Sequence, residues 1–389
     1  MTTDLNLLTT KTTGQNVYGI DASSANKEKR TGVENYSRSL IETMKTHQLE
    51  GGESVVLYSN TKLDQALGTL PQGWSSVILN WPLGSGWMSL RVSWEMLRRK
   101  PNVLFVPGQA LPIVCPRAVV TTVHDLAFLR RPDLYEPATR KRLKRATKRA
   151  VKKAARIIVP TQATKQDLVE LFHVDAARIV VIAEATDTNL YRRYTQEEAR
   201  STLQKHRLGT NFFLVVGRLE KKKNITNLIR AFELFKNRRG LGDPFELVFV
   251  GDPGYGYDEM KKYFDLSPHK AQIRQLGYIP DEEVAQLMSQ AIAYLFPSWY
   301  EGFGIPNLEA MAAGTCLISS DIPAHREVVG DAGLLVPPEE PEAWAHALER
   351  IVKDGTLRTE LVAKGTQRVK QFFWQKTAEQ TWEVLRSLV

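Results

Sequence analysis

Cysteine is scarce in this sequence, whose 389 residues include only Cys115 and Cys316. The two residues lie far apart, and neither has a histidine or a second cysteine at metal-ligand spacing. We therefore expect a reduced, cytoplasmic protein without a structural zinc site or another bound metal.

Long apolar runs are also absent. No stretch approaches the roughly 20 apolar residues that a membrane-spanning helix needs. Residues 1–15 are polar and rich in threonine, without the apolar core of a signal peptide, so we expect a loose lead-in there. The hydrophobic content of 43% and the charged content of 24% are typical of a soluble globular protein. The length predicts about two to three domains.

Acidic residues are absent from Arg140–Arg156, which carries ten basic ones. The net charge of +9 belongs to residues 1–187, because residues 188–389 hold 26 basic and 26 acidic residues. A solvated helix face is the commonest meaning of such a run. Attachment to an anionic inner membrane face is the second interpretation, at about 1 kcal/mol per basic residue. Nucleic acid is not expected, because no aromatic residues for base stacking are interleaved.

Short β-type runs alternate with amphipathic stretches, which predicts parallel α/β architecture. Strands are expected near Val17–Ile20, Val55–Tyr58, Val77–Leu79, Val103–Val106, Val119–Val123, Ile157–Val159, Ile179–Ile182, Phe213–Val216, Leu247–Val250, Gln272–Gln275, Ala293–Phe296, Cys316–Ser319 and Leu334–Val336. Helices are expected near Gly32–Thr46, Trp87–Arg99, Ala138–Ala155, Thr164–Phe172, Ile225–Asn237, Asp281–Gln290, Pro306–Ala313, Pro341–Lys353 and Lys376–Leu388.

An irregular segment, Glu184–Tyr194, follows the last strand of the first half. We place an N-terminal α/β domain at residues 1–187, a C-terminal one at 188–370 and a closing helix at 371–389. No long Gly/Ser linker separates the halves, so we expect a cleft whose ligand bridges both domains.

The richest segment lies between residues 297 and 314. Glu301 and Glu309 flank a loop with Gly302 and Gly304, and a helix is expected to begin near Pro306. Glycines let backbone N–H groups approach a ligand, and a helix N-terminus attracts phosphate. The carboxylates can accept hydrogen bonds from sugar or ribose hydroxyls. The plainer alternative is a surface loop before a capped helix.

Polar residues follow several of the expected strands. Open α/β sheets bind ligands beyond the carboxyl ends of their strands, so these residues are expected to share a site. They are Asp21 and the Arg30-Thr31-Gly32 turn, His124 with Asp125, Gly217 with Arg218, the loop from Gly251 to Gly256, and Glu301.

Arg218 and Lys223 form the expected phosphate grip. A bidentate guanidinium and a nearby ammonium suit a diphosphate. A basic loop that caps a helix is the alternative. Lys221 and Lys222, between them, are expected to be solvated.

The carboxylate segment resembles the Glu-x7-Glu signature of family-4 retaining glycosyltransferases. It has both glutamates at the right spacing, Gly-Phe-Gly between them, and Glu-Ala-Met-Ala-Ala-Gly from Glu309 onward. The resemblance implies the GT-B fold, with two Rossmann-like domains whose parallel sheets face a cleft and a C-terminal helix that crosses back. It also implies metal-independent transfer from a nucleoside-diphosphate sugar, with retained configuration and no protein nucleophile.

The resemblance assigns roles to individual residues. Arg218 and Lys223 would stabilise the departing diphosphate, Glu301 would position the donor sugar and Glu309 the ribose. His124 would lie near an outer hydroxyl of the sugar, where a neutral imidazole could both donate and accept. Asp125 could orient that histidine or contact the acceptor. Further donor-binding candidates are Gly32, Gly217, Gly251, Tyr278, Ile279, Phe303, Gly304 and Ile305.

Similarity around Gly32 and His124 favours GDP-mannose as donor, with UDP-glucose or another hexose second. The acceptor would be a glycan or a lipid-linked saccharide, in polysaccharide or glycolipid biosynthesis. Two rivals stay open: a nucleotide-sugar epimerase, and a non-catalytic protein that binds nucleotide or RNA. One departure is the segment 183–187, Ala-Glu-Ala-Thr-Asp, where relatives often carry Asn-Gly-Val-Asp. No role is assigned to that segment.

Overall fold

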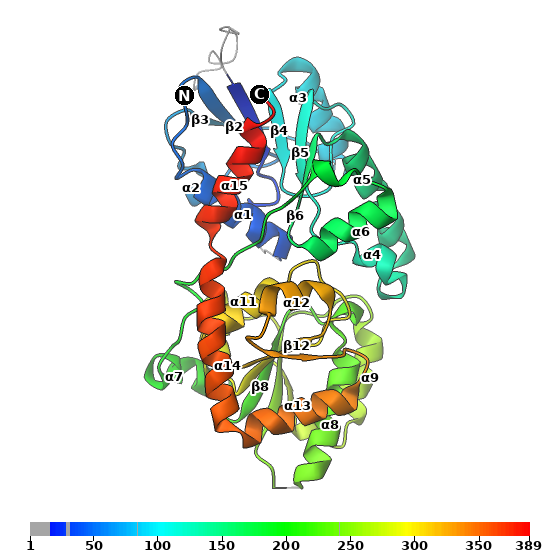
Figure 1. Cartoon of the computed structure of the whole chain (residues 1–389), viewed down its shortest axis with the longest axis vertical. Coiled ribbons are helices and arrows are strands. Elements are labelled where there is room, and N and C mark those ends of the chain that lie inside the picture. Colours follow the sequence, from blue (N-terminus) through cyan, green and yellow to red (C-terminus); the bar gives the residue numbers. More distant parts are fainter. Residues whose placement is uncertain (1–15, 29–31, 84, 241) are drawn as a thin grey trace. The chain divides into compact units, whose positions relative to one another are not determined.

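The computed structural model describes residues 16–28, 32–83, 85–240 and 242–389. The chain divides into two compact units (Figure 1). The first comprises the chain up to Leu126, Lys141–Glu184 and Trp374–Val389, and the second comprises Ala127–Arg140 and Ala185–Phe373. The expected lead-in and two residues of the turn before Gly32, Arg30 and Thr31, lie outside the described residues.

The first unit is built on a sheet of seven parallel strands in the order β3-β2-β1-β4-β5-β6-β7. The direction of winding reverses between β1 and β4, which is where such sheets bind ligands. The strands are β1 Asn16–Asp21, β2 Glu53–Ser59, β3 Trp74–Ile78, β4 Val103–Val106, β5 Ala118–Thr122, β6 Arg156–Val159 and β7 Ile179–Val181.

Helices pack on this sheet and include the C-terminal one. Helix α15 packs against α1, and its Trp382 ring meets Tyr18 edge-on at 5.4 Å between centroids. Helices α1 and α2 face the same core cluster as α15, whereas α3 and α5 face a second cluster. The helices encountered along this part of the chain are α1 Gly32–Met44, α2 Gln65–Gly68, α3 Ser93–Arg98, α4 Ala127–Arg130, α5 Pro137–Lys153, α6 Gln162–Phe172 and α15 Trp374–Arg386, with short turns at Pro132–Leu134 and Ala176–Arg178.

One predicted helix differs in kind. The segment expected to form a single α-helix over Trp87–Arg99 begins as a π-helix, η1 (Trp87–Val92), and continues as α3. Apolar spacing does not distinguish the i→i+5 bonding of a π-turn from the i→i+4 bonding of an α-helix, so the sequence could not indicate the change.

The second unit holds a six-stranded parallel sheet in the order β10-β9-β8-β11-β12-β13. Its winding reverses between β8 and β11. Both sheets agree with the predicted α/β fold of two Rossmann-like domains, and all their strands overlap the expected runs. The strands are β8 Phe212–Val216, β9 Glu246–Val250, β10 Ile273–Gln275, β11 Ala293–Phe296, β12 Leu317–Ser320 and β13 Leu334–Val336.

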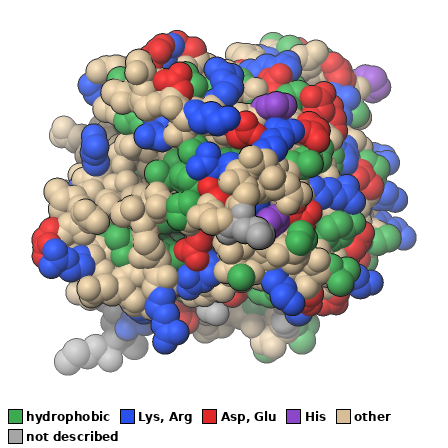
Figure 2. All heavy atoms as spheres, turned by 90° about the horizontal axis from the view of Figure 1, so that it is seen from below, with side chains coloured by type: hydrophobic (Ala, Val, Ile, Leu, Met, Phe, Trp, Pro, Cys, Tyr) green, Lys and Arg blue, Asp and Glu red, His purple; other side chains and the backbone are tan. Residues whose placement is uncertain are grey.

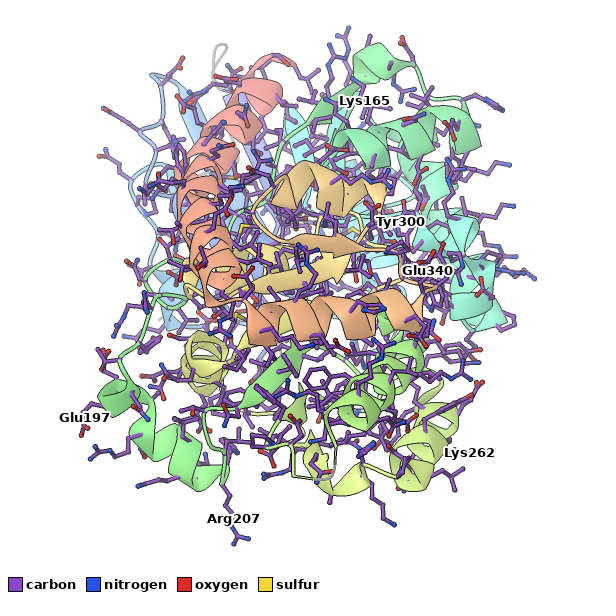
Figure 3. The ribbon with its side chains drawn as sticks, turned by 60° about the horizontal axis from the view of Figure 1, so that its bottom comes forward. Lys165, Glu197, Arg207, Lys262, Tyr300 and Glu340 are labelled. Carbon is purple, nitrogen blue, oxygen red and sulfur yellow. The ribbon has the colours of Figure 1, made fainter. Side chains whose placement is uncertain are left out.

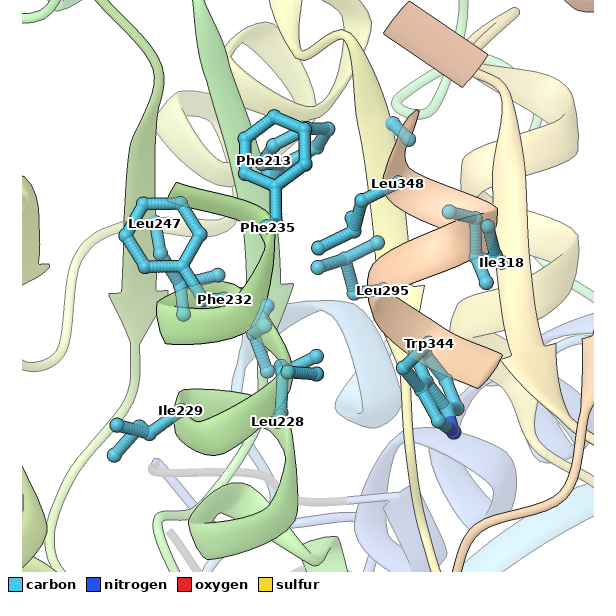
Figure 4. Packing of buried hydrophobic residues seen from close by; sticks show 14 of the residues in the cluster. Phe213, Leu228, Ile229, Phe232, Phe235, Leu247, Leu295, Ile318, Trp344 and Leu348 are labelled. Carbon is cyan, nitrogen blue, oxygen red and sulfur yellow. The ribbon is translucent and has the colours of Figure 1, made fainter. Parts of the chain in front are cut away.

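Helices α8 (Ile225–Arg239) and α13 (Pro341–Lys353) lie side by side over one face of this sheet (Figure 4). Phe232 and Phe235 of α8 and the fully buried Trp344 of α13 fill the space above the strands. The remaining elements of this unit are α7 Gln196–Lys205, η4 Lys221–Lys223, α9 Tyr257–Leu266, η5 Lys270–Gln272, α10 Asp281–Gln290, α11 Ile305–Ala312, α12 Pro323–Val329, α14 Gly355–Arg368 and η6 Val369–Gln371.

Helices α7, α9, α12 and α14 were not expected from the sequence. Helix α14 buries only Leu361 and Gly365, so it has almost no apolar stripe for a pattern to reveal. Side chains near these elements, such as Glu197, Arg207 and Lys262, project outward (Figure 3). Basic and acidic groups are intermixed on the face in Figure 2. Within the described residues, no helix is both long and apolar enough to cross a membrane.

Candidate functional site

The winding of the second sheet reverses between β8 and β11, and two lysines meet a glutamate there. Lys223 follows β8 and Glu301 follows β11; the Lys223 Nζ atom lies 2.8 Å from Glu301 Oε1. Lys222 Nζ lies 3.1 Å from Glu301 Oε2. Burial alone would raise the pKa of Glu301, but the two ammonium groups hold it well below its usual range. Glu301 is therefore an ionised carboxylate in a largely enclosed cluster of charges.

Lys222 corrects one expectation. Its side chain is only 13% exposed and pairs with Glu301, so it is not simply solvated. Lys221 does lie at the surface, where it pairs with Glu259 at 2.6 Å. The difference arises because η4 is a tight turn that directs successive lysines to different sides.

An aromatic ring packs against this cluster of charges, and a buried histidine packs against the ring. Lys223 Nζ lies 4.6 Å from the centre of the Phe296 ring, and His325 stacks on that ring at 5.0 Å. The His325 Nδ1 atom is 3.1 Å from the Ser320 carbonyl oxygen, so Nδ1 must be the nitrogen that carries a hydrogen for this bond to form. Burial lowers the pKa of His325 to about 4, so the ring is neutral near pH 7. Its other nitrogen, Nε2, therefore carries a lone pair.

Gly304 is required by this packing. Its φ is +92°, and a Cβ atom there would lie 2.9 Å from Asn307 Nδ2 and 3.0 Å from His325 Nε2. Neither nitrogen has a hydrogen-bond partner among the described residues. Helix α11 begins at Ile305, one residue before the expected start near Pro306. The loop at Phe303 and Gly304 thus presents the N-terminus of α11 beside Glu301.

The loops after β8 and β9 lie against each other. The Leu219 N–H donates to the Asp252 carbonyl oxygen at 2.9 Å. Gly217 and Gly251 have φ values of +136° and +134°, and a Cβ on Gly251 would lie 2.2 Å from the Gly217 carbonyl oxygen. Arg218, which directly follows Gly217, is exposed and makes no ion pair with any described residue. Its guanidinium is thus available for an anion.

Glu309, in α11, differs from Glu301 in its electrostatics. Burial and the nearby charge of Asp281 raise the pKa of Glu309 to about 8, against a hydrogen bond from Tyr191 that lowers it. Part of the side chain stays accessible, so it combines desolvation with contact to solvent. Near neutral pH, Glu309 is a largely protonated acid that a ligand could ionise.

Tyr278 and Ile279 follow β10. The Gly251 N–H donates to the Gly277 carbonyl oxygen at 2.8 Å, which ties this segment to the β9 loop. Ile279 is only 5% exposed, whereas Tyr278 is 56% exposed. The Tyr278 residue is therefore accessible to a ligand, whereas Ile279 is buried.

In the first unit, His124 follows β5 and lies between two hydrogen-bond acceptors. Its Nδ1 atom is 2.8 Å from Glu184 Oε1, and its Nε2 atom is 3.1 Å from the Pro107 carbonyl oxygen. The ring of Tyr36 packs on it edge to face at 4.7 Å. Because both partners are acceptors, both bonds form fully only with both ring nitrogens protonated. The neutral imidazole expected for His124 is therefore not the form that this geometry favours.

Glu184 is the residue that sequence reasoning missed. It lies in the segment 183–187, which departs from the family pattern, and its side chain is 7% exposed. Burial alone would lower the pKa of His124, but the hydrogen bond and charge of Glu184 raise it overall, with a smaller contribution from Asp125. The available signal was a glutamate three residues after β7, since polar residues that follow parallel strands gather at one sheet edge.

Replacing Glu184 with glutamine is expected to lower the pKa of His124, because the amide keeps the size of the side chain but not its charge. Histidine NMR titration measures this directly, and Glu170→Gln on the exposed side of α6 is the control. Because the pKa of His124 is raised in the folded protein, its protonation stabilises the fold. This stabilisation is complete below the pKa of an unfolded histidine and is lost as pH rises through the pKa of folded His124. The stability difference between wild type and Glu184→Gln should shrink over that range. An unchanged His124 titration would contradict the pairing.

Asp125 and Gly32 also belong to the first unit. Gly32 is exposed at the start of α1, and no described atom lies within 4 Å of where its Cβ would be. Packing among the described residues therefore does not require glycine there.

Two family models match the chain. Residues 30–190 match the model described as Glycosyltransferase Family 4, and residues 197–368 match Glycosyl transferases group 1. The O-antigen chain mannosyltransferase B of Escherichia coli is 31% identical over 293 residues, which cover 75% of this chain and 76% of that protein. The O-antigen chain mannosyltransferase RfbU of Salmonella typhimurium is 28% identical over 274 residues, covering 70% of each.

Solved structures share the fold. Sucrose-phosphate synthase from Thermosynechococcus elongatus superposes with a TM-score of 0.74 at 20% identity, over 96% of this chain and 99% of that one. Anabaena HepE in complex with UDP-glucose gives a TM-score of 0.72 at 20% identity, over 95% and 99%. At such identities the likeness shows the fold alone.

Proposed function

Because the chain belongs to glycosyltransferase family 4, with the GT-B fold, we propose that it is a retaining hexosyltransferase in polysaccharide or glycolipid biosynthesis. It would transfer mannose from GDP-mannose to a hydroxyl of a glycan or lipid-linked saccharide. The observation that carries the proposal is the pairing of Lys222 and Lys223 with Glu301 where the winding of the second sheet reverses. The two ammonium groups can bind a diphosphate, and the Glu301 carboxylate beside them can accept hydrogen bonds from the hydroxyls of the attached sugar.

Charge stabilisation is the proposed source of catalysis. When the bond from the sugar to the diphosphate breaks, negative charge grows on the departing phosphate oxygen. Arg218, Lys223 and the N–H groups around Phe303–Ile305 would stabilise it. The acceptor hydroxyl would attack on the face from which the diphosphate leaves, and its proton would pass to the departing phosphate. No protein nucleophile and no metal are needed in this scheme.

The remaining residues would orient the donor. The ionised Glu301 would accept hydrogen bonds from sugar hydroxyls, and Glu309 from the ribose. His124 would release its bond to the Pro107 carbonyl oxygen to contact the transferred sugar. Asp125 would support His124 or contact the acceptor. Close backbone approach is proposed at Gly32, Gly217, Gly251 and Gly304, and base contact at Tyr278 and the backbone of Ile279.

The donor preference rests on similarity. Several relatives are named mannosyltransferases, which supports mannose, and UDP-glucose or another hexose stays the second choice. Calorimetry with GDP-mannose, UDP-glucose and free GDP and UDP tests the proposal, with Glu301→Ala and Lys223→Ala as controls. Donor binding that Glu301→Ala weakens strongly and Lys223→Ala weakens less supports the proposal. If no sugar nucleotide binds, the transferase proposal fails; free UDP and a modified sugar without acceptor would indicate an epimerase instead.

Because the pKa of Glu309 is raised, we expect the affinity for the donor to depend on pH. Ribose hydroxyls donate to the carboxylate, so binding favours ionised Glu309. Since its pKa is about 8, donor affinity should rise up to about tenfold per pH unit from pH 6 towards 8 and then level off. Calorimetry at pH 6, 7, 8 and 9 measures this, and Glu309→Gln should remove the slope. A wild-type affinity that does not change with pH would contradict the ribose role.

A further inference from the structure

Three large apolar side chains stand exposed on one face of the η1–α3 helix. Leu90, Trp94 and Leu97 are 53%, 55% and 57% exposed. They recur at i, i+4 and i+7, which places them along one side, while Val92 and Met96 on the other side enter the core. One side of the helix therefore packs into the core, and the opposite, solvent-exposed side is apolar as well.

A neighbouring loop extends this surface. The Ile113 N–H donates to the Ser93 hydroxyl at 2.8 Å, which ties this loop to α3, and Ile113 is 50% exposed. We call Leu90, Trp94, Leu97 and Ile113 the α3 face. Single exposed apolar residues are normal on proteins, but a contiguous set indicates an interaction site.

The stretch of chain that carries the α3 face holds almost only positive charges. Between Asp64 and Asp125 the only acidic residue is Glu95, which is 7% exposed and paired with Arg91 at 3.2 Å. Arg98 ends α3, and Arg99 and Lys100 follow it directly. The apolar face therefore ends in three consecutive cations.

The basic helix α5 supplies further cations beside the same loop. Arg149 Nη1 donates to the Leu111 carbonyl oxygen at 3.5 Å, and both Arg149 and Lys153 act electrostatically on Cys115. Ala150 of α5 shares a core with Met96 of α3. The α3 face and the second half of α5 thus belong to one continuous part of the first unit.

We propose that the α3 face docks on a lipid bilayer with anionic headgroups. Leucine and isoleucine side chains would enter the acyl boundary, Trp94 would lie at headgroup level, and Arg98–Lys100 with the α5 cations would meet the lipid phosphates. A symmetric contact between two copies would instead bring these clusters of positive charge together. The inference concerns binding to a surface and does not depend on the proposed transfer reaction; a lipid-linked acceptor would be met on that surface.

Vesicle flotation of the full chain tests this proposal. The wild type should bind to vesicles made of equal amounts of phosphatidylcholine and phosphatidylglycerol. It should bind far less to vesicles of phosphatidylcholine alone. Trp94→Ser combined with Leu97→Ser should weaken binding tenfold or more. Leu266→Ser is the matched control, because this residue is 82% exposed in the second unit, and it should bind as wild type does. Circular dichroism checks that each variant is folded.

A second measurement separates insertion from simple charge attraction. Lipids brominated on the acyl chain should quench tryptophan fluorescence of the wild type, and Trp94→Phe should keep binding but lose that quenching. The proposal is overturned if the wild type does not float with anionic vesicles, or if the double variant floats equally well. It is also overturned if sedimentation shows that the double variant converts a dimer to a monomer, since the face then joins two copies.

Discussion

Replacing Lys223 with alanine is expected to slow sugar transfer about 10²–10³-fold, mainly through kcat. The proposed role of Lys223 grows as charge develops on the departing diphosphate, so its loss affects the transition state more than the bound donor. Glu301 keeps its ion pair with Lys222 at 3.1 Å, so the carboxylate is not left without a cation. The measurement is a full kcat and KM determination by nucleotide release.

Lys221→Ala is the matched control for this substitution. Lys221 belongs to the same turn but pairs with the exposed Glu259, so its removal should leave kcat within about twofold, as expected for a surface ion pair. Similar unfolding temperatures for both variants would show that any loss of rate is chemical. Equal kcat values in the two variants would contradict the assignment of Lys223.

Replacing Gly251 with alanine is expected to destabilise the second unit by about 3 kcal/mol or more. The new methyl group would lie 2.2 Å from the Gly217 carbonyl oxygen, at a φ of +134° that alanine rarely adopts. The backbone must move, and the move displaces the loop that carries Arg218. Urea unfolding measures the stability change, and donor binding should weaken with it.

Gly209→Ala provides the comparison for the same chemical change. No described atom lies within 4 Å of its Cβ position and its φ is not positive, so the expected change is within about 0.5 kcal/mol. If Gly251→Ala were as harmless as Gly209→Ala, the two loops would not be in the tight contact described above.

The strands were predictable from the sequence for a physical reason. A parallel sheet is covered on both faces, so its inner strands are short, nearly continuous apolar runs such as Phe212–Val216, whereas the edge strand β3 is largely exposed. Helices were predictable where one face is clearly apolar, as in α8, and were missed where burial is sparse, as in α14. The shared edge of Arg218, Lys223 and Glu301 in the second unit was predictable, because residues that follow strands of one parallel sheet reach the same edge.

The sequence by itself determined the fold class and the family, and it marked Arg218, Lys223, Glu301 and Glu309 as candidates, since these depend on local motifs and on the alternation of strands and helices along the chain. Only the tertiary structure decided which charges meet. Lys223 and Glu301 are 78 residues apart, and His124 and Glu184 are 60 apart. A pKa depends on burial and on the charges within a few ångströms, and neither quantity is written in the local sequence. For that reason Lys222 and Glu184, which no motif marked, emerged as partners only in three dimensions.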